Sequence, residues 1–588
     1  MANIEYFETV VVGSGFGGSV ATHRLAEAYH DVGDGDRVCL LERGKSYAPG
    51  EFARAPWEFG RNFWQPKKGQ RGLFDVWSFK GCEAVVSAGL GGGSLIYSNA
   101  MVRPPAEWLA DWPVEYADLA QHYAGVEQML DGQSFPAGEK AYAGVAKAPA
   151  MQKAAGLVGK SADFDFVKLA VSFHDRPGPA GILGVGMPLQ PKPYGNLHTT
   201  GHARTTCTLC CQCNIGCNQG SKNTLDHTYL SAAQYLGAEI RPHSEVKVIR
   251  PIAKDGRDGY EVDYLDYGDA DSNTDGSDAA AQPERRTLRC RRLILSAGTF
   301  GTTYLLLKNS RNFPQLSPAL GQRFSTNGDY LMWLNGAKQP AEPGRTTRKP
   351  MHFYPSVGLP VTMAIKYDDF YLEDAGYPVI LDWILAAKDG LLGRAIRFLL
   401  RYLWAWLTRN AAGRISNQLA LVIGNGGAEA DSIPLGAMGL DEPNGVMAYK
   451  PRRWLLFSKR KRRLQVNWTM KSSKAYFTEV EREMTKISDA LGARIARSTL
   501  SKLGRSIAVH PLGGCPMGSS PETGVCDPYG EVFGYDNLFV ADGSVMPSPI
   551  GANPSLTIAA FSSRMADAIV DGKTRRPDPA HLAGTSSR

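Results

Sequence analysis

The sequence contains no apolar run long enough to cross a bilayer, because no segment offers the roughly eighteen uncharged apolar residues that a spanning helix needs. Its first residues, MANIEYFETVVV, also lack the basic stretch, the apolar core and the small-residue cleavage site of a secretory signal. We therefore expect a cytoplasmic protein that is soluble or at most peripheral to a membrane.

Evenly distributed cysteines are missing as well. Five of the ten cysteines fall within residues 207–217, which does not fit the disulfide framework of a secreted domain and favours a reducing compartment. A net charge of +7 over 588 residues is too small to indicate a nucleic-acid partner. The length and the hydrophobic content of 43% predict a globular protein with at least two structural units.

A glycine-rich turn follows the first apolar run of the chain. Residues 7–12, FETVVV, predict a strand, and residues 19–30, SVATHRLAEAYH, predict a helix. Between them, Gly13, Gly15 and Gly18 form the pattern GxGxxG. The first glycine permits a tight turn, the second lets the backbone approach a pyrophosphate, and the third lets the helix pack closely on the sheet. This unit predicts dinucleotide binding at the positive end of the helix dipole.

Glu42 supports this interpretation. It lies near the end of a second predicted strand, RVCLLERG, twenty-four residues beyond Gly18, close to the ~20 residues typical of dinucleotide-binding folds. A carboxylate there can accept hydrogen bonds from ribose hydroxyls and disfavours the 2′-phosphate of NADP. The sequence therefore favours NAD or FAD.

Three further segments carry small residues where backbone must come close to a ligand. Residues 88–101, AGLGGGSLIYSNAM, are too rich in glycine for an ordinary helix or strand, and their interleaved apolar residues indicate a buried loop. Ala297 and Gly298 form a turn between an apolar strand and a helix. Asp542 and Gly543 end the strand NLFVAD, and an Asp-Gly turn there can present a carboxylate and an amide to a cofactor.

Taken together, four motifs resemble those of the glucose–methanol–choline (GMC) oxidoreductases. They are the GxGxxG unit at residues 10–27, GLGGGSLIYSNAM at 89–101, HPLGGCPMG at 510–518, and LFVADGSVMPSPIGANPSLTIAAFSSRMAD at 538–567. The second and third are most similar to those of the bacterial cholesterol oxidase-like and long-chain alcohol oxidase branches. The resemblance covers the nucleotide-binding parts at both ends of the chain.

The resemblance implies a mixed α/β fold. It combines a Rossmann-like FAD-binding domain, which has a parallel sheet and is discontinuous in sequence, with a substrate-binding domain built on an antiparallel sheet with helices. FAD is expected to be bound non-covalently, because SLIYSN stands where some members attach the flavin through a histidine. The expected ranges are 1–110, 205–320 and 501–575 for the FAD-binding domain, 111–204 and 321–500 for the substrate-binding domain, and 576–588 for a flexible tail.

The same resemblance assigns the cofactor-binding residues. The ADP half of FAD would be held by the GxGxxG glycines and Glu42, and the backbone of Val246 would contact the adenine. The other candidate cofactor-binding residues are Gly92, Gly93, Ser94, Tyr97, Asn99, Ala297, Gly298, Asp542, Gly543, Pro554 and Thr557.

His510 and Asn553 are the candidate catalytic residues. In the family, the histidine of the HPLGG-type motif and a histidine or asparagine before a proline lie over the reactive face of the flavin, and these positions are His510 and Asn553 here. Removing hydride from a carbinol carbon requires a base for the hydroxyl proton. Histidine, with an unperturbed pKa of about 6.5, suits that task near neutral pH, and asparagine can hold the substrate oxygen. The alternative is a core histidine beside a turn.

The run CTLCCQCNIGC, residues 207–217, has the spacing CxxCxxCxxxC with one additional cysteine. This spacing is similar to that of ferredoxins, although Asn218 stands where bacterial ferredoxins place proline. An iron–sulfur cluster and buried structural thiols are both open interpretations. No other metal site is expected.

Residues 390–410, GLLGRAIRFLLRYLWAWLTRN, predict a basic amphipathic helix. Such a helix either lies in a membrane interface or packs its apolar face on the substrate-binding domain. In the first case, the protein would collect a lipophilic alcohol from membranes.

The sequence thus predicts FAD-dependent oxidation of a hydrophobic alcohol, sterol-like or long-chain, with oxygen or another electron acceptor. One alternative is a dehydrogenase of a sugar or other polar alcohol that passes electrons through a cluster at residues 207–217. Another is a non-catalytic flavin-binding protein associated with membranes. Steroid isomerisation, which cholesterol oxidases perform with a carboxylate of the substrate domain, is not predicted, and Glu429 is the one residue we name for that position.

Overall fold

The structure is a computed structural model. It describes residues 4–30, 37–54, 58, 62–174, 184–198, 203–268, 282–339, 349–351, 357–376, 432–451, 462–497, 501 and 504–573.

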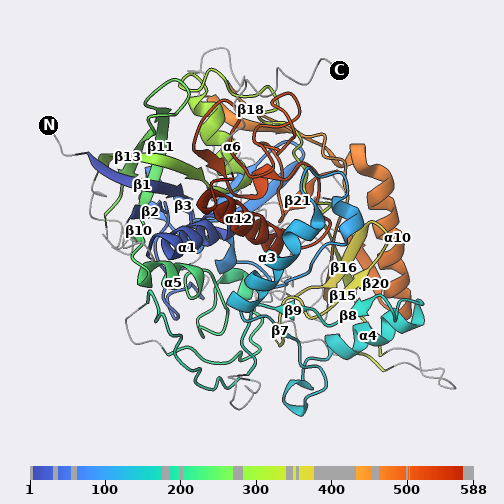
Figure 1. Cartoon of the computed structure of the whole chain (residues 1–588). Helices are drawn as coiled ribbons and strands as arrows, with labels where there is room; N and C mark the ends of the chain where they lie inside the picture. The colour runs from blue at the N-terminus through green and yellow to red at the C-terminus, as the bar shows by residue number, and fades with distance from the viewer. Residues whose placement is uncertain are drawn as a thin grey trace.

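A seven-stranded mixed sheet forms the centre of the first half of the molecule (Figure 1). Its strands are β1 (Glu5–Val12), β2 (Val38–Leu41), β10 (Glu239–Arg241), β11 (Ser244–Pro251), β12 (Tyr260–Asp266), β13 (Glu284–Leu295) and β22 (Leu538–Val540). Their order is β10-β2-β1-β13-β12-β11, and β22 pairs with β13 beside this path. The pairs among β10, β2, β1, β13 and β22 are parallel, whereas β12 is antiparallel to both neighbours. The apolar run at Val10–Val12 is buried because parallel strands are covered on both faces.

Helices cover this sheet. They are α1 (Phe16–His30), α3 (Tyr116–Met129), α5 (Tyr229–Tyr235), α6 (Gly298–Asn309) and α12 (Pro554–Val570). α1 packs against α5 and α12, and α12 packs against α3. In Figure 1, α6 lies above the sheet, and α1 and α5 lie below it. The first and last helices of this half therefore lie side by side although they are more than five hundred residues apart in sequence.

A six-stranded antiparallel sheet dominates the second half. Its strands are β8 (Phe164–Asp165), β14 (Tyr330–Asn335), β15 (Ala364–Lys366), β16 (Phe370–Asp374), β17 (Ile433–Gly439) and β20 (Arg494–Arg497). The order is β20-β14-β17-β16-β15-β8. The amphipathic helix α10 (Lys474–Ala490) packs on β14 and β20 and also contacts α4 (Lys147–Leu157).

Smaller elements complete the structure. A three-stranded sheet has β21 (Ser506–Ala508) parallel to β6 (Cys82–Ser87), which is antiparallel to β5 (Phe74–Ser78). The remaining strands form the pairs β18 (Val446–Pro451) with β19 (Arg462–Asn467), β3 (Trp64–Gln65) with β4 (Gln70–Arg71), and β7 (Gln133–Ser134) with β9 (Lys168–Leu169).

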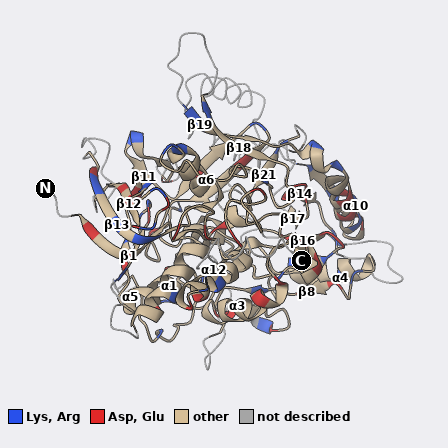
Figure 2. Ribbon diagram, turned by 45° about the horizontal axis from the view of Figure 1, so that its top comes forward, with Lys and Arg blue, Asp and Glu red and all other residues tan. Residues whose placement is uncertain are grey.

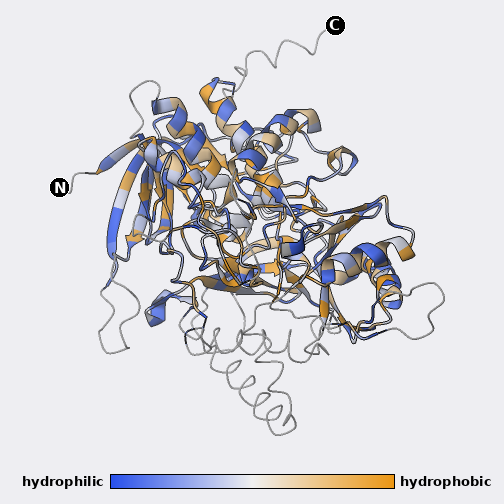
Figure 3. Ribbon diagram, turned by 90° about the horizontal axis from the view of Figure 1, so that it is seen from below, coloured by the Kyte–Doolittle hydropathy of each residue, from blue (hydrophilic) through white to orange (hydrophobic). Residues whose placement is uncertain are grey.

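Each of the two larger sheets has a hydrophobic core of its own. The first core includes β1, β13 and α12, and the second includes β14, β17 and α10. Figure 3 shows hydrophobic and hydrophilic residues on the same helices and strands, as expected for elements with one buried side and one exposed side. Figure 2 shows charged residues spread over the outer elements, with basic residues on β19.

The mixed α/β fold with one largely parallel sheet and one antiparallel sheet is confirmed. The strands of the first sheet fall within the ranges assigned to the FAD-binding domain, and those of the second within the ranges assigned to the substrate-binding domain; the boundaries themselves stay a prediction. The predicted helix at 390–410, Glu429 and the predicted tail at 576–588 lie outside the described residues.

Candidate active site

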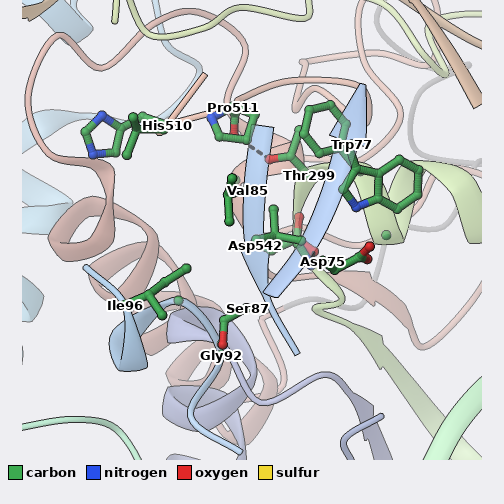
Figure 4. Close-up of a pocket in the computed structure, with 18 of the residues that line it drawn as sticks. Asp75, Trp77, Val85, Ser87, Gly92, Ile96, Thr299, His510, Pro511 and Asp542 are labelled. Carbon is green, nitrogen blue, oxygen red and sulfur yellow. Dashed lines mark hydrogen bonds between the residues drawn. The ribbon is translucent and has the colours of Figure 1, made fainter. Parts of the chain in front are cut away.

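A cavity of about 1230 Å³ connects the glycine motifs with both candidate catalytic residues. Figure 4 shows His510 at one end of the view and Trp77 at the other, with Asp542 and Thr299 between them. Gly92 and Ile96 lie along another side of the same space. The cavity exceeds the 300–1000 Å³ of a typical small-molecule pocket, so it has room for more than one drug-sized ligand.

The GxGxxG glycines serve different purposes at one end of this cavity. Gly13 has φ +100°, and a Cβ there would lie 2.3 Å from the carbonyl oxygen of Ser296. A Cβ at Gly18 would lie 2.0 Å from the carbonyl oxygen of Gly13. A Cβ at Gly15, by contrast, would meet no atom within 4 Å among the described residues. Packing therefore requires the first and third glycines, whereas the second faces open space beside the start of α1.

Glu42 lies directly after β2 and lines the cavity. Its carboxylate accepts hydrogen bonds from the backbone N–H and the hydroxyl of Ser14, at 3.1 and 2.6 Å, and from the N–H of Gly44 at 2.9 Å. Burial raises the pKa of Glu42, although these hydrogen bonds act in the opposite direction. The carboxylate is thus fixed in the cavity wall by three protein donors.

The second glycine motif lies against the first. It forms a 3-10 turn, Gly92–Leu95, in which Gly92 has φ +52°, and a Cβ there would lie 2.7 Å from the Cα of Gly15. Behind this turn, the hydroxyl of Ser94 accepts a hydrogen bond from the N–H of Leu225 at 3.0 Å. The turn is thereby anchored to the segment that leads into α5.

Asp542 links β22 to the start of α6. One carboxylate oxygen accepts hydrogen bonds from the N–H and the hydroxyl of Ser544, at 2.8 and 2.6 Å. The other accepts from the N–H of Gly298 at 2.9 Å and from the hydroxyl of Thr302 at 2.5 Å. Burial raises the pKa of Asp542, and the four hydrogen bonds oppose that effect. The predicted Asp-Gly turn does border the cavity, but its carboxylate is fully engaged by the protein.

The structure brings most of the predicted site residues to one cavity, and their roles stay predictions. The residues that line it are Gly13, Gly15, Glu42, Gly92, Gly93, Tyr97, Val246, Ala297, Gly298, His510, Asp542, Gly543, Asn553 and Pro554. Gly18, Ser94, Asn99 and Thr557 lie behind the lining. The hydroxyl of Thr557 is instead 3.0 Å from the hydroxyl of Tyr123 in the core.

His510 is held by an aspartate that the sequence did not reveal. Its Nδ1 lies 2.7 Å from one carboxylate oxygen of Asp329, and the N–H groups of Val509 and His510 donate to the other oxygen at 2.6 and 2.7 Å. Burial alone would lower the pKa of His510, but the charge and hydrogen bond of Asp329 raise it above the ordinary value. With Nδ1 donating to Asp329, the lone pair of the neutral ring is on Nε2.

Glu373, at the end of β16, is the second group that sequence reasoning missed. Nδ2 of Asn553 donates to its Oε2 at a long 3.5 Å, while Oε1 of Glu373 and Oδ1 of Asn553 are buried without a hydrogen-bond partner among the described residues. Burial raises the pKa of Glu373 to about 8, although the charge of His510 and the Asn553 hydrogen bond lower it. Unpaired buried oxygen atoms are costly, so this pair fits a ligand that supplies the missing partner.

The turn before Asn553 is fixed by Asn327. The side-chain oxygen of Asn327 accepts hydrogen bonds from the N–H groups of Ile550 and Gly551, both at 2.9 Å, and its Nδ2 donates to the carbonyl of Ala552 at 2.9 Å. Asn553 then precedes α12, which begins with a proline at its first position, where a missing N–H has no cost.

Asp329 and Glu373 leave weak signals in the sequence. Asp329 directly precedes β14, and Glu373 is one of two adjacent carboxylates, with Asp374, at the end of the segment FYLED. A buried acid in an apolar strand is unusual and could have marked Glu373. Nothing local connects either residue to His510, since the link depends on how the second sheet is assembled. Glu429, the residue named for a second carboxylate, lies outside the described part of the chain.

Two further expectations concern the cysteines of residues 207–217 and the absence of a membrane-spanning helix. Within the ranges that the structure describes, all five cysteines of residues 207–217 are free thiols, and no three of their sulfur atoms lie within 4.8 Å of one another. The same ranges contain no helix that is both long and apolar enough to span a membrane.

Comparisons with known proteins show which proteins this chain is similar to. Residues 458–562 match the family model for GMC oxidoreductase. A cholesterol oxidase from Acinetobacter baumannii is 28% identical over 592 residues, which cover 95% of this chain and 93% of the relative. A 2-methyl-1,2-propanediol dehydrogenase from Mycolicibacterium austroafricanum is 23% identical over 603 residues, covering 96% and 95%. A long-chain-alcohol oxidase from Arabidopsis thaliana is 41% identical over 64 residues, 11% of this chain and 9% of the relative.

The order of the motifs, the mixed α/β fold and these matches lead to one assignment. The chain carries the GMC oxidoreductase domain at residues 458–562 and is similar over nearly its full length to oxidases and dehydrogenases, so it is an enzyme of the class that acts on CH–OH donors.

Proposed function

We propose that the protein uses non-covalently bound FAD to oxidise a hydrophobic alcohol, sterol-like or long-chain, to its carbonyl compound in the cytoplasm. Dioxygen or another acceptor would reoxidise the cofactor. The observation that carries the proposal is that His510 and Asn553 line the same cavity as the glycine motifs.

The residues at the glycine end fit a dinucleotide. Added Cβ atoms at Gly15, Gly93 and Gly298 would meet no atom within 4 Å among the described residues, so backbone is open to a ligand at three points. The start of α1 adds the partial positive charge that favours a pyrophosphate. Bound there, FAD would supply the hydride acceptor. No histidine stands in the second glycine motif, which supports non-covalent binding.

His510 is the group that takes the hydroxyl proton in this proposal. Its Nδ1 is occupied by Asp329, so Nε2 is the nitrogen available to a substrate hydroxyl. Asp329 also stabilises the positive charge that the ring gains when it accepts the proton. Burial, which raises the pKa of Glu373 to about 8, keeps that carboxyl protonated near neutral pH and leaves His510 as the base.

Asn553 is the group that holds the substrate oxygen. Among the described residues, its Nδ2 makes only the long contact to Glu373, so it can donate to an incoming hydroxyl oxygen. A protonated Glu373 can also donate a hydrogen bond in the same place, because its Oε1 has no partner within the described residues. These contacts would orient the C–H bond and keep water away from the reacting carbon.

The substrate class is inferred from the part of the cavity wall that the second sheet supplies. Leu331 of β14, Ala437 and Met438 of β17, and Val361 line the same cavity as His510 and Asn553. Apolar side chains combined with a few polar groups favour a lipophilic molecule with a single hydroxyl. The cholesterol oxidase and the long-chain-alcohol oxidase among the relatives support the same substrate class.

Anaerobic titration of the purified yellow protein tests the proposal. We expect a 3β-hydroxysteroid or a long-chain 1-alkanol to bleach the flavin absorbance, and an aldose to leave it unchanged. A colourless protein that does not take up added FAD would refute the proposal. Bleaching by the aldose alone, with iron in the protein, would favour the sugar dehydrogenase instead.

A further inference from the structure

Three buried side chains with metal-binding atoms meet outside the cavity lining. They are His198, in a loop, and Asp226 and His227, in the segment that leads into α5 (Figure 1). Each offers one atom of a type that binds metals, and these atoms all lie within 4.8 Å of one another. The exposed fractions of the three residues are 8%, 1% and 5%, so solvent does not satisfy them.

The two imidazoles approach the same carboxylate oxygen. Nε2 of His198 lies 2.7 Å from Oδ2 of Asp226, and Nε2 of His227 lies 3.9 Å from it. The two rings are edge to face, with centroids 5.1 Å apart. Zinc bonds of about 2.0–2.2 Å in a tetrahedral site place ligand atoms roughly 3.4 Å apart, so shifts of under about 1 Å would bring all three atoms onto one ion.

The outward nitrogens of both rings also face side-chain oxygens. Nδ1 of His198 lies 3.5 Å from the hydroxyl of Ser46, and Nδ1 of His227 lies 3.3 Å from the side-chain oxygen of Asn196. That Asn196 oxygen accepts a further hydrogen bond from the N–H of His198 at 3.0 Å. In metal centres, a ligating imidazole commonly donates its second N–H to such an oxygen, which fixes the ring.

A buried carboxylate oxygen marks the same place. Oδ1 of Asp226 is buried and makes no short hydrogen bond among the described residues, although the nearby hydroxyl of Thr224 interacts with the carboxylate and lowers the pKa of Asp226. Within those residues, the ion-pair partners of Asp226 are the two imidazoles. A buried carboxylate is stable only when it is paired or when it coordinates a metal. Oδ2 of Asp226 is paired with the imidazoles, and Oδ1 is the carboxylate oxygen left open to a cation.

We infer that His198, Asp226 and His227 bind a divalent transition-metal ion, represented here by Zn²⁺. Imidazole and carboxylate ligands suit this class of ion. The ion would join the loop of His198 to the segment that anchors the second glycine motif through Leu225 and Ser94. Its role is structural, and the inference does not depend on the proposed oxidation.

Metal content of the full chain, purified without a histidine tag, tests the inference. After treatment with EDTA, incubation with zinc sulfate and gel filtration, we expect about one zinc ion per chain by mass spectrometry. Zinc should raise the thermal midpoint by about 5 °C, because it binds the folded state only. X-ray absorption should show nitrogen and oxygen ligands alone. A zinc content below about 0.1 per chain, an unchanged midpoint, or sulfur at about 2.3 Å would overturn the inference.

Matched variants locate the site. His198→Gln and His227→Gln should each lower zinc affinity at least ~10-fold, since each removes one ligand. His174→Gln is the control, because His174 pairs with Glu139 at 3.0 Å and lies outside the cluster. Equal loss of zinc from His174→Gln would contradict the assignment. If a ligand variant does not fold, the content and ligand set of the unaltered chain still decide the question.

Discussion

The chemistry of the candidate site depends on one contact between an imidazole and a carboxylate. Asp329 accepts the hydrogen bond from Nδ1 of His510 while two backbone N–H groups hold its other oxygen. The carboxylate therefore cannot rotate freely, and it fixes both the orientation of the ring and the nitrogen that carries the lone pair. In the proposed reaction, this contact prepares Nε2 to accept a proton.

Asp329→Asn tests that contact through the pH dependence of turnover. Asp329 raises the pKa of His510, and only the neutral imidazole can accept a proton, so activity should rise with pH as His510 deprotonates. Without the negative charge, the acidic limb of the kcat/KM profile should move to lower pH by about one unit or more. The plateau should also fall, because the ring loses its orientation. Asp163→Asn, at a half-exposed pair with Lys160, should leave the limb in place; an unmoved limb in Asp329→Asn would contradict the account.

Glu373 gives a prediction about stability rather than rate. Burial raises the pKa of Glu373 from 4.5 to about 8. The folded protein therefore holds a proton that the unfolded chain has released, and the associated stability is present below about pH 4.5 and is lost as the pH rises to about 8. Glu373→Gln cannot lose a proton, so its thermal midpoint should fall less over this range. Glu479→Gln, at the surface, is the control and should follow wild type. If the thermal midpoint falls equally with pH in Glu373→Gln and in wild type, the carboxyl of Glu373 is not buried and protonated.

At the scale of elements, the strand–turn–helix unit of β1 and α1 is the part that binds the cofactor in the proposal. Two of its glycines are required by backbone contacts of 2.3 and 2.0 Å, and the third opens onto the cavity. A substitution at Gly13 or Gly18 should therefore damage folding, whereas a substitution at Gly15 should damage cofactor binding alone.

Gly15→Ala should therefore yield a folded protein with little flavin. The added methyl group meets no described atom, so the thermal midpoint without cofactor should stay close to that of wild type. The methyl group would occupy space that the proposal gives to the pyrophosphate, and FAD affinity should fall by roughly tenfold or more, which corresponds to about 1.4 kcal/mol. Flavin absorbance per protein measures the effect. Gly18→Ala should instead lower the midpoint, and full flavin content in Gly15→Ala would refute the placement.

Lys147 supports the strand that carries Glu373. Its ammonium group, on α4, lies 2.9 Å from Asp374 in an ion pair that is almost fully buried, and it donates to the carbonyls of Pro360 and Ala375 at 2.8 and 3.1 Å. Lys147→Met leaves a buried unpaired carboxylate and should cost about 3–5 kcal/mol in urea unfolding.

An exposed lysine and a double variant complete that experiment. Lys168→Met, at a half-exposed pair with Glu127, should cost less than about 1 kcal/mol. Combining Lys147→Met with Asp374→Asn should recover part of the loss, because no buried charge then lacks a partner. A loss no larger in Lys147→Met than in Lys168→Met would show that the buried pair is not needed.

The elements that were predicted best are those with local signals. β1, α1 and the turn between them follow from GxGxxG. Asp329 and Glu373 could not be placed, because Asp329 precedes β14 and Glu373 lies in β16, strands of a sheet in which β16 pairs with β17 across more than fifty residues. Alternating apolar residues predict a strand but not its partner.

At the scale of the whole molecule, the cavity is built by segments from almost the entire length of the chain. The glycine motifs, β14, β16, His510 and Asn553 all contribute to its wall. Sequence order gives no indication of this arrangement beyond the family resemblance. Delivery of a lipophilic substrate from a membrane through residues 390–410 stays a prediction, since that segment lies outside the described residues.

The most direct test of the central claim is anaerobic rapid mixing of the flavin-loaded enzyme with its best alcohol, comparing wild type with His510→Gln. If His510 is the proton acceptor, the variant should keep the oxidised flavin spectrum and reduce its flavin about 10²–10⁴-fold more slowly. Equal rates of flavin reduction in the two proteins would contradict the account.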